Sequence, residues 1–179
     1  MVDLKEFEQK AADLRVLGMK ISIGQDTVYE KYWDEDCRRN IYSASKSFTS
    51  CAVGFAVQEG LIDLDERLMD AFKEDIPNNP DENLKKATVK DLLTMTLGQE
   101  KGFLMGKQRP RMEEQNWVKA SLAIPFVYEP GTHFVYNNVG PYLAGILVQR
   151  RAGCDLLSYL TPRLLKPLGI RKTIWEVDP

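Results

Sequence analysis

Residues 41–60 read IYSASKSFTSCAVGFAVQEG and carry the most apolar helical pattern in the chain. The apolar residues follow the spacing of one helix face and then fill the other: Phe48, Cys51, Ala52, Phe55 and Ala56, then Val53 and Val57. A helix that is apolar nearly all round is normally buried inside a protein. We therefore expect a central, buried helix from Ser43 to Gly60, in which Cys51 is a small buried hydrophobe.

The residues before this helix combine helix and strand patterns. Lys5–Leu17 has the spacing of a short amphipathic helix. Met19–Ile23 alternates apolar and polar residues, and Thr27–Trp33 is rich in β-branched and aromatic residues. Because Gly24–Asp26 is typical of a turn, the two segments predict a β-hairpin. An isolated hairpin cannot bury a face by itself, and the sequence supplies no further strands to complete a sheet.

The residues after this helix predict further helices. Thr88 and Asp91 have the spacing of a capping box at the start of a short helix. Two longer patterns follow, over 112–122 and from Asn138 or Val139 to Gly153, and Asp155 has the place of an N-cap for a last helix. The order of elements indicates a small α/β segment, residues 1–42, followed by a mostly helical region, residues 43–179.

Composition limits the classes of function. A chain of 179 residues fits one domain. Its net charge of −2 offers no basic excess for nucleic acid, and no run of about 18 apolar residues predicts a membrane span. A single histidine excludes multi-histidine metal sites, and three widely spaced cysteines make no disulfide framework. No leader is evident at the N-terminus. We expect a cytoplasmic protein without metal or cofactor.

Ser43 and Lys46 form the first candidate site. Their spacing places the lysine one turn above the serine on the same helix face. An amine in an apolar surround tends to lose its proton, and a neutral lysine can accept the proton of a serine hydroxyl. The helix N-terminus would favour a developing oxyanion at Ser43. The alternative is that Ser43 is an N-cap and Lys46 a solvated residue of the first turn.

Tyr136 and Asn138 form the second candidate site. In an extended segment, residues two apart point to the same side. A tyrosine hydroxyl can relay a proton, and an asparagine amide can hold both a lysine amine and a substrate carbonyl. The alternative is an aromatic anchor followed by an Asn N-cap.

Together the two motifs resemble those of class C β-lactamases and penicillin-binding-protein-like serine hydrolases. The segment around Ser43 is similar to the family's Ser-x-x-Lys motif, and Tyr136-Asn137-Asn138 is similar to its Tyr-x-Asn motif, which that family places about ninety residues later. The hairpin before the serine and the segments 59–65, 89–96, 129–132 and 166–170 also have the style of the family.

The resemblance implies a role for each matched residue. Ser43 would be the acylated nucleophile, Lys46 its base partner, and Tyr136 the group that moves the proton to and from the leaving group. Asn138 would position Lys46 and bind the substrate amide.

One family motif has no match in the chain. The family carries a Lys-Thr-Gly or His-x-Gly strand, which supplies a second oxyanion N–H, whereas Lys172-Thr173 is followed by Ile174. We therefore expect an α+β, β-lactamase-like partial domain over 1–179 without the C-terminal strands of the sheet. An unpaired edge of the hairpin would then be open to self-association, which predicts a homo-oligomer.

The resulting expectation is a serine hydrolase that forms an acyl-enzyme with a small amide or ester. β-Lactams, D-amino-acid peptides and simple esters are the candidate substrates. For this chain itself we expect weak activity or none, because one oxyanion donor alone is worth on the order of a hundredfold in rate. The alternative function is a catalytically incomplete fragment or pseudoenzyme that serves as a binding or self-association module.

Two other groups carry weaker chemical signals. His133 lies three residues before Tyr136, but no Gly-x-Ser-x-Gly elbow accompanies it, which favours a histidine in a surface turn. Lys107, Arg109 and Arg111 could hold a carboxylate, although a solvated loop face explains them as well.

Overall fold

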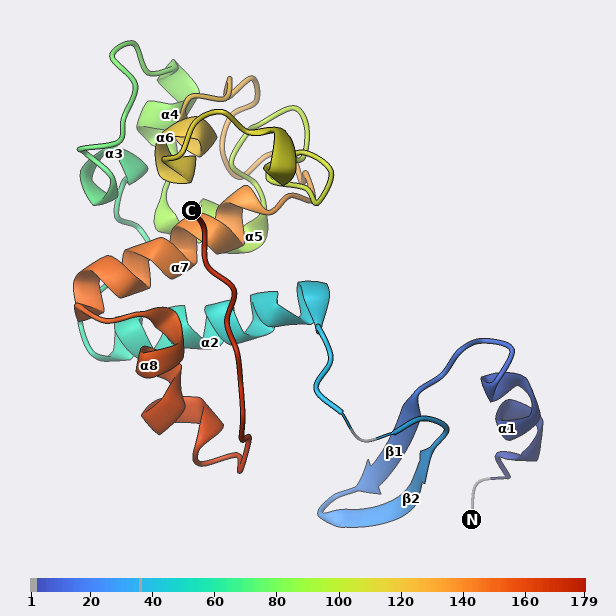
Figure 1. Cartoon of the computed structure of the whole chain (residues 1–179). Helices are drawn as coiled ribbons and strands as arrows, with labels where there is room; N and C mark the ends of the chain where they lie inside the picture. The colour runs from blue at the N-terminus through green and yellow to red at the C-terminus, as the bar shows by residue number, and fades with distance from the viewer. Residues whose placement is uncertain (1–2, 36) are drawn as a thin grey trace. The chain divides into compact units, whose positions relative to one another are not determined.

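A computed structural model describes residues 3–35 and 37–179 of the chain. The chain divides into two compact units, Met1–Tyr42 and Ser43–Pro179. Figure 1 shows the course of the chain through both units. Within the described residues, no helix is both long and apolar enough to cross a lipid bilayer.

The first unit contains a short helix and the expected hairpin. Helix α1 (Lys5–Ala11) is followed by the antiparallel strands β1 (Gly18–Ile23) and β2 (Asp26–Tyr32), with one irregularity in register between Ile21 and Ser22. Gly24 makes the turn at φ +62°, which glycine adopts without steric cost. In the described part of the chain, the sheet has only these two strands.

Side-chain contacts of α1 hold it to the hairpin. The Glu8 carboxylate accepts a hydrogen bond from the Tyr29 hydroxyl at 2.8 Å and another from the Lys31 amine. Phe7 meets Trp33 edge to face, with 6.0 Å between ring centroids. Ala11 is the one fully buried apolar residue among the described residues of this unit. The unit is therefore held by surface contacts more than by a core.

The second unit is helical, as the sequence predicts. Its α-helices are α2 (Ser45–Gln58), α3 (Leu68–Ala71), α4 (Glu82–Lys86), α5 (Val89–Thr94), α6 (Trp117–Leu122), α7 (Val139–Ala152) and α8 (Leu156–Leu160). Short helical turns occupy η1 (Tyr42–Ala44), η2 (Arg109–Arg111) and η3 (Thr161–Leu165).

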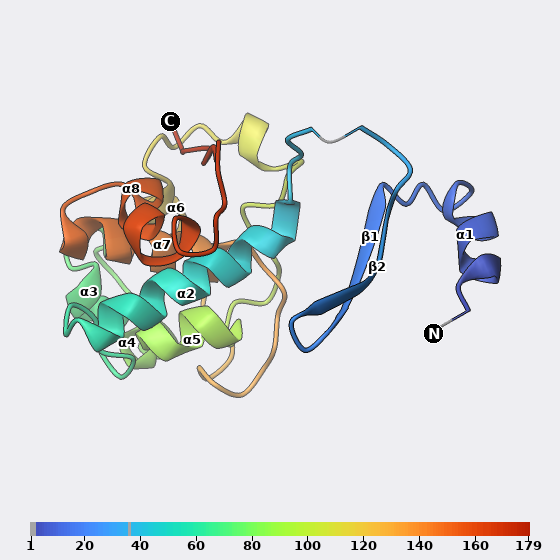
Figure 2. The ribbon, with the colours of Figure 1, turned by 90° about the horizontal axis from the view of Figure 1, so that it is seen from below.

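Helices α2 and α7 pack on one another in the core of this unit. They run side by side in Figure 1, and α2 lies in front of α7 in Figure 2. Val53 and Ala56 of α2 belong to the same buried apolar core as Leu143 and Leu147 of α7. Helix α5 packs on α7 at Gly140, where an added Cβ would lie 2.2 Å from the Leu92 carbonyl oxygen. Burying each valine or leucine side chain of this kind contributes about 1.5–3 kcal/mol before the entropy of ordering is counted.

Capping side chains define the helix ends that the sequence marked. The Asp91 carboxylate accepts from the backbone N–H of Thr88 at 2.9 Å and from its hydroxyl at 2.8 Å. The Asp155 carboxylate accepts from the N–H of Ser158 at 2.9 Å at the start of α8. The expected caps at both helices are thus confirmed.

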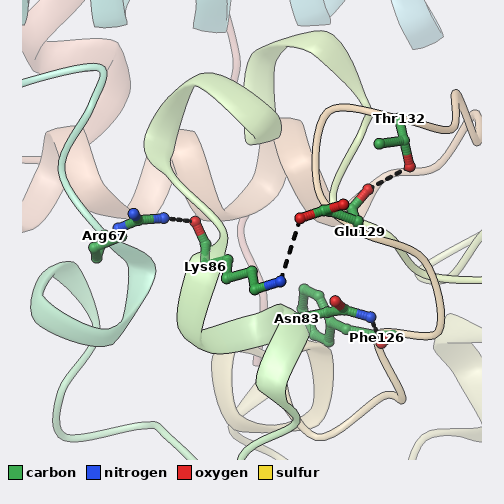
Figure 3. A network of polar contacts seen from close by, with 6 residues as sticks. All are labelled: Arg67, Asn83, Lys86, Phe126, Glu129 and Thr132. Atoms are coloured by element: carbon green, nitrogen blue, oxygen red, sulfur yellow. Dashed lines mark hydrogen bonds and ion pairs between the residues drawn. The ribbon is translucent and has the colours of Figure 1, made fainter.

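A polar network fixes the loop that leads from α6 to α7 (Figure 3). The Asn83 amide donates to the Phe126 carbonyl at 2.8 Å, and the Lys86 amine lies 3.2 Å from the Glu129 carboxylate. The Thr132 hydroxyl donates to the Glu129 carbonyl at 2.6 Å, and Arg67 donates to the carbonyl of Lys86. Helix α4 therefore holds residues 126–132 shortly before the chain reaches Tyr136.

Three sequence predictions need correction. The N-terminal helix ends at Ala11 instead of Leu17, and the helix expected over 112–122 begins only at Trp117. Cys51 is exposed, so the prediction that it is buried is wrong. Its helix α2 buries Thr49, Ala52, Val53 and Ala56 on one side and leaves Cys51 exposed. The apolar composition of a helix alone does not tell how many of its faces pack against other elements.

Tyr159 offers a test of the packing between α2 and α8. Its ring is buried, and its hydroxyl donates to the Glu59 carboxylate at 2.8 Å. Replacing Tyr159 by Phe keeps the ring and removes this bond, so we expect the free energy of unfolding to fall by about 1 kcal/mol at neutral pH. Urea unfolding followed by circular dichroism measures the change.

The same variant should also change how the free energy of unfolding depends on pH at alkaline pH. Burial, followed by the bond to Glu59, raises the pKa of Tyr159 to about 12. The folded chain therefore keeps a proton that the unfolded chain releases from about pH 10 upward, and stability should fall between about pH 10 and pH 12. Tyr159→Phe should lose less stability over this window. An identical loss in both chains would show that Tyr159 is not its source.

Candidate active site

Ser43 and Lys46 lie at the start of α2. Ser43 belongs to the turn η1, and α2 itself begins two residues later, at Ser45. Ser43 is exposed, and Lys46 is half-buried. The N-cap residue of α2 is Ala44, so Ser43 precedes the helix instead of capping it. This leaves the Ser43 hydroxyl available to another partner.

Tyr136 is that partner. Residues 133–137 have no regular secondary structure and lead into α7, as the sequence suggests. The Tyr136 hydroxyl donates to the Ser43 hydroxyl oxygen at 2.7 Å across 93 positions in sequence. The amine of Lys46 lies over the Tyr136 ring, 5.2 Å from its centroid, which is a cation–π distance. Tyr136 therefore touches both residues of the first motif.

Asn138 completes the cluster. Its Oδ1 accepts from the Lys46 amine at 2.6 Å, and its Nδ2 donates to the Leu104 carbonyl at 2.9 Å. Although Asn138 is the N-cap residue of α7, its side chain makes no capping bond. The neighbouring Asn137 accepts from the N–H of Gly140 at 3.1 Å instead. Asn138 is therefore free to face Lys46, and the alternative that it merely caps α7 is excluded.

Electrostatics within the cluster act on Tyr136. The hydrogen bond with Ser43 is the largest influence and lowers the pKa of the Tyr136 phenol, while partial burial opposes the change. The nearby Lys46 amine lowers the pKa further, because its charge favours the phenolate. A larger share of Tyr136 is therefore ionised near neutral pH than in a free tyrosine.

The four predicted residues thus form one chain of contacts: Ser43, Tyr136, Lys46 and Asn138. Ser43 and Lys46 come from the start of α2, while Tyr136 and Asn138 come from the segment that enters α7. Within 3–35 and 37–179, the side-chain hydrogen bond of Ser43 goes to Tyr136, and that of Lys46 goes to Asn138. Once Tyr136 is ionised, its phenolate is the group in this arrangement that can accept the proton of the Ser43 hydroxyl.

The sequence did not identify the segment 102–104 as part of this cluster. The Phe103 carbonyl accepts from the N–H of Asn138 at 3.2 Å, and the Leu104 carbonyl accepts from its side chain. These contacts are made by the backbone, so no residue type marks them in advance.

The remaining candidates lie outside the cluster. His133 is exposed and stacks on Tyr128, with 4.2 Å between ring centroids, and its Nδ1 lies 2.8 Å from the Thr132 hydroxyl oxygen. This is the arrangement of a histidine in a surface turn. Lys107, Arg109 and Arg111 are exposed on the loop that follows Leu104.

The Tyr136 phenol provides a direct test of the cluster. In Ser43→Ala we expect the pKa of Tyr136 to rise, because the phenolate loses the hydroxyl that stabilises it. Carbon NMR of the chain labelled in its tyrosine rings follows the titration, and Tyr136→Phe identifies the resonance. Ser158→Ala is the matched control, since this serine on α8 bonds to Asp155. An unchanged titration in Ser43→Ala would contradict the contact.

Comparison with known proteins places this geometry in context. The chain is 31% identical over 165 residues to monacolin J acid methylbutanoyltransferase from Aspergillus terreus, which covers 81% of the chain and 39% of that protein. It is 31% identical over 150 residues to lovastatin esterase from Penicillium rubens, covering 72% of the chain and 37% of the esterase. The chain thus spans about two fifths of the length of these relatives.

Solved structures show the same fold. The octameric penicillin-binding protein homologue from Pyrococcus abyssi superposes with a TM-score of 0.74 at 24% identity, over 95% of this chain and 44% of that one. A class C beta-lactamase superposes with a TM-score of 0.73 at 18% identity, over 92% and 48% of the two chains. The α+β, β-lactamase-like fold expected from the sequence is therefore confirmed.

A family model decides the classification. The model of the beta-lactamase family, described as Beta-lactamase, matches residues 5–179. This match includes both units and all four residues of the cluster. The chain therefore belongs to the beta-lactamase family.

Proposed function

We propose that the protein is a serine hydrolase or acyltransferase that works through an acyl-enzyme at Ser43. The observation that carries the proposal is the hydrogen bond between the hydroxyls of Tyr136 and Ser43, beside a lysine amine held by Asn138. A serine hydroxyl is a weak nucleophile until a neighbouring group takes its proton. The cluster supplies that group.

Tyr136 takes the proton in the proposed first step. The Ser43 oxygen attacks the substrate carbonyl carbon while its proton passes to the Tyr136 phenolate, which is the group in direct contact with it. The lowered pKa of Tyr136 increases the share of phenolate, and the Lys46 amine offsets the negative charge. Tyr136 then gives the proton to the leaving oxygen or nitrogen as its bond to the carbonyl carbon breaks.

Lys46 and Asn138 hold this pair in place. The 2.6 Å bond from the Lys46 amine to Asn138 fixes the cation beside the Tyr136 ring. The amine of a lysine ends a flexible four-carbon side chain, so it needs such an anchor to stay in one place. In the proposal, Lys46 assists Tyr136 electrostatically instead of contacting Ser43, which modifies the direct base role that the family resemblance implies.

The second step returns Ser43 to its free form. An incoming hydroxyl group gives its proton to the Tyr136 phenolate and attacks the acyl carbon. Tyr136 then returns this proton to the Ser43 oxygen as the bond between that oxygen and the acyl carbon breaks. Water as the incoming group gives hydrolysis, and an alcohol gives acyl transfer. One relative is named as an esterase and another as a methylbutanoyltransferase, which supports esters of small acyl groups as substrates. β-Lactams and D-amino-acid peptides are the other candidates.

Covalent labelling tests the nucleophile. Exposure to a fluorophosphonate should add one phosphonyl group to the chain, located at Ser43 by peptide mass spectrometry. Ser43→Ala should abolish the adduct, and Ser158→Ala should leave it unchanged. Tyr136→Phe should slow labelling by about a hundredfold or more, because the proton acceptor is lost.

The rate of labelling also decides between the two proposed roles. No Lys-x-Gly or His-x-Gly match to the family's third motif follows Asn138 in the chain, so labelling should be slower by on the order of a hundredfold than with two oxyanion donors. A chain that stays unmodified after prolonged exposure would instead support the binding or self-association module. An adduct that persists in Ser43→Ala would remove Ser43 as the nucleophile.

A further inference from the structure

Residues 102–104 run against the segment that carries Tyr136 and Asn138. One close approach and two hydrogen bonds to backbone carbonyls join the two segments. An ideal Cβ at Gly102 would lie 2.7 Å from the Tyr136 carbonyl oxygen, the Phe103 carbonyl accepts from the N–H of Asn138 at 3.2 Å, and the Leu104 carbonyl accepts from the Asn138 side chain at 2.9 Å. Both residues of the second motif therefore rest on the same short loop.

Position 102 needs glycine because a larger side chain has no room there, and not because of its backbone conformation. Its φ lies outside the left-handed region, so an alanine could adopt the same backbone. A methyl group 2.7 Å from the Tyr136 carbonyl oxygen, however, is closer than carbon and oxygen approach in folded proteins. Because the obstacle is backbone, it can be relieved only by moving one segment away from the other. Moving residue 136 changes the place of its phenol relative to Ser43 and Lys46.

Leu104 fixes the orientation of the Asn138 amide. Its side chain is 2% exposed, and its backbone has φ +55°, a conformation that costs a non-glycine residue about 1–2 kcal/mol. Held in this way, its carbonyl takes the Nδ2 donor of Asn138, so Oδ1 faces the Lys46 amine. The opposite orientation of the amide would point N–H groups at an ammonium and an oxygen at a carbonyl oxygen.

We propose that Gly102, Phe103 and Leu104 form a positioning loop that sets the phenol of Tyr136 and the amide of Asn138 against Ser43 and Lys46. The contacts of the loop described above are with the carbonyl of Tyr136 and with Asn138, so we assign it a positioning role and no step of the reaction. The effect of the loop on the reactivity of Ser43 rests on the proposed function, whereas its effect on the place of Tyr136 and Asn138 does not. The two effects can be measured separately.

Gly102→Ala and Gly106→Ala make a matched pair for the test. At Gly106, in the same loop, an added Cβ meets only the end of the flexible Arg109 side chain, at 3.7 Å. The readout is the NMR titration of Tyr136 in tyrosine-labelled chains. In Gly102→Ala we expect the pKa of Tyr136 to rise toward the ordinary tyrosine value, because its phenolate loses Ser43 and Lys46. Gly106→Ala should titrate like the unmodified chain.

Kinetics give the second readout of the same pair. Labelling of Ser43 by a fluorophosphonate should slow by roughly a hundredfold in Gly102→Ala, since a displacement of about 1 Å in a catalytic group can cost that much. Gly106→Ala should label at the unmodified rate. A loop that only stabilises the fold would lower the urea midpoint of Gly102→Ala and leave both the Tyr136 titration and the labelling rate unchanged, which would overturn the proposal.

Leu104→Gly covers the case in which Gly102→Ala does not fold. Glycine adopts φ +55° freely and keeps the carbonyl, while the buried side chain that holds the loop is lost. The pKa of Tyr136 should again rise, and an unchanged value would overturn the proposal. If the unmodified chain takes no label, the proposed function fails, but the Tyr136 titrations still decide whether the loop positions the cluster.

Discussion

The hydrogen bond from the Lys46 amine to Asn138 Oδ1, at 2.6 Å, is the contact on which the rest of the site depends. It joins the start of α2 to the start of α7 across 92 positions in sequence. A half-buried ammonium is costly unless an oxygen accepts from it, so the bond compensates for placing a charge beside the core. With the amine fixed there, the Tyr136 ring lies beside the lysine charge while its hydroxyl bonds to Ser43.

Packing between helices supplies the frame for this bond. Val53 and Ala56 of α2 and Leu143 and Leu147 of α7 are buried in the same apolar core, and the two helices pack on one another. Gly140 lets α5 approach α7 closely near the end that carries Asn138. Because close-packed interiors transmit small shifts, a change in this interface would reach Lys46 and Asn138 together.

The site combines rigid and open parts. Asn138 is held by two carbonyls of the 102–104 loop and by Lys46, whereas Ser43 is exposed and Tyr136 is 45% exposed. A nucleophile must be accessible to its substrate. The attraction between a lysine charge and a nearby negative charge is stronger where water is partly excluded. The proposed acyl-enzyme chemistry fits this division, with the positioning groups inside and the reacting hydroxyls at the surface.

The sequence by itself determined the helical order, the hairpin, the caps at Asp91 and Asp155, and the four residues of the cluster, because each rests on local spacing or on the family motifs. It could not decide that Cys51 faces outward, since composition does not tell which helix faces find partners. Nor could it show that Tyr136 hydrogen-bonds to Ser43, or that the carbonyls of Phe103 and Leu104 orient Asn138. Those contacts join segments far apart in the chain, and Phe103 and Leu104 take part only through their backbone carbonyls, so tertiary packing alone decides them.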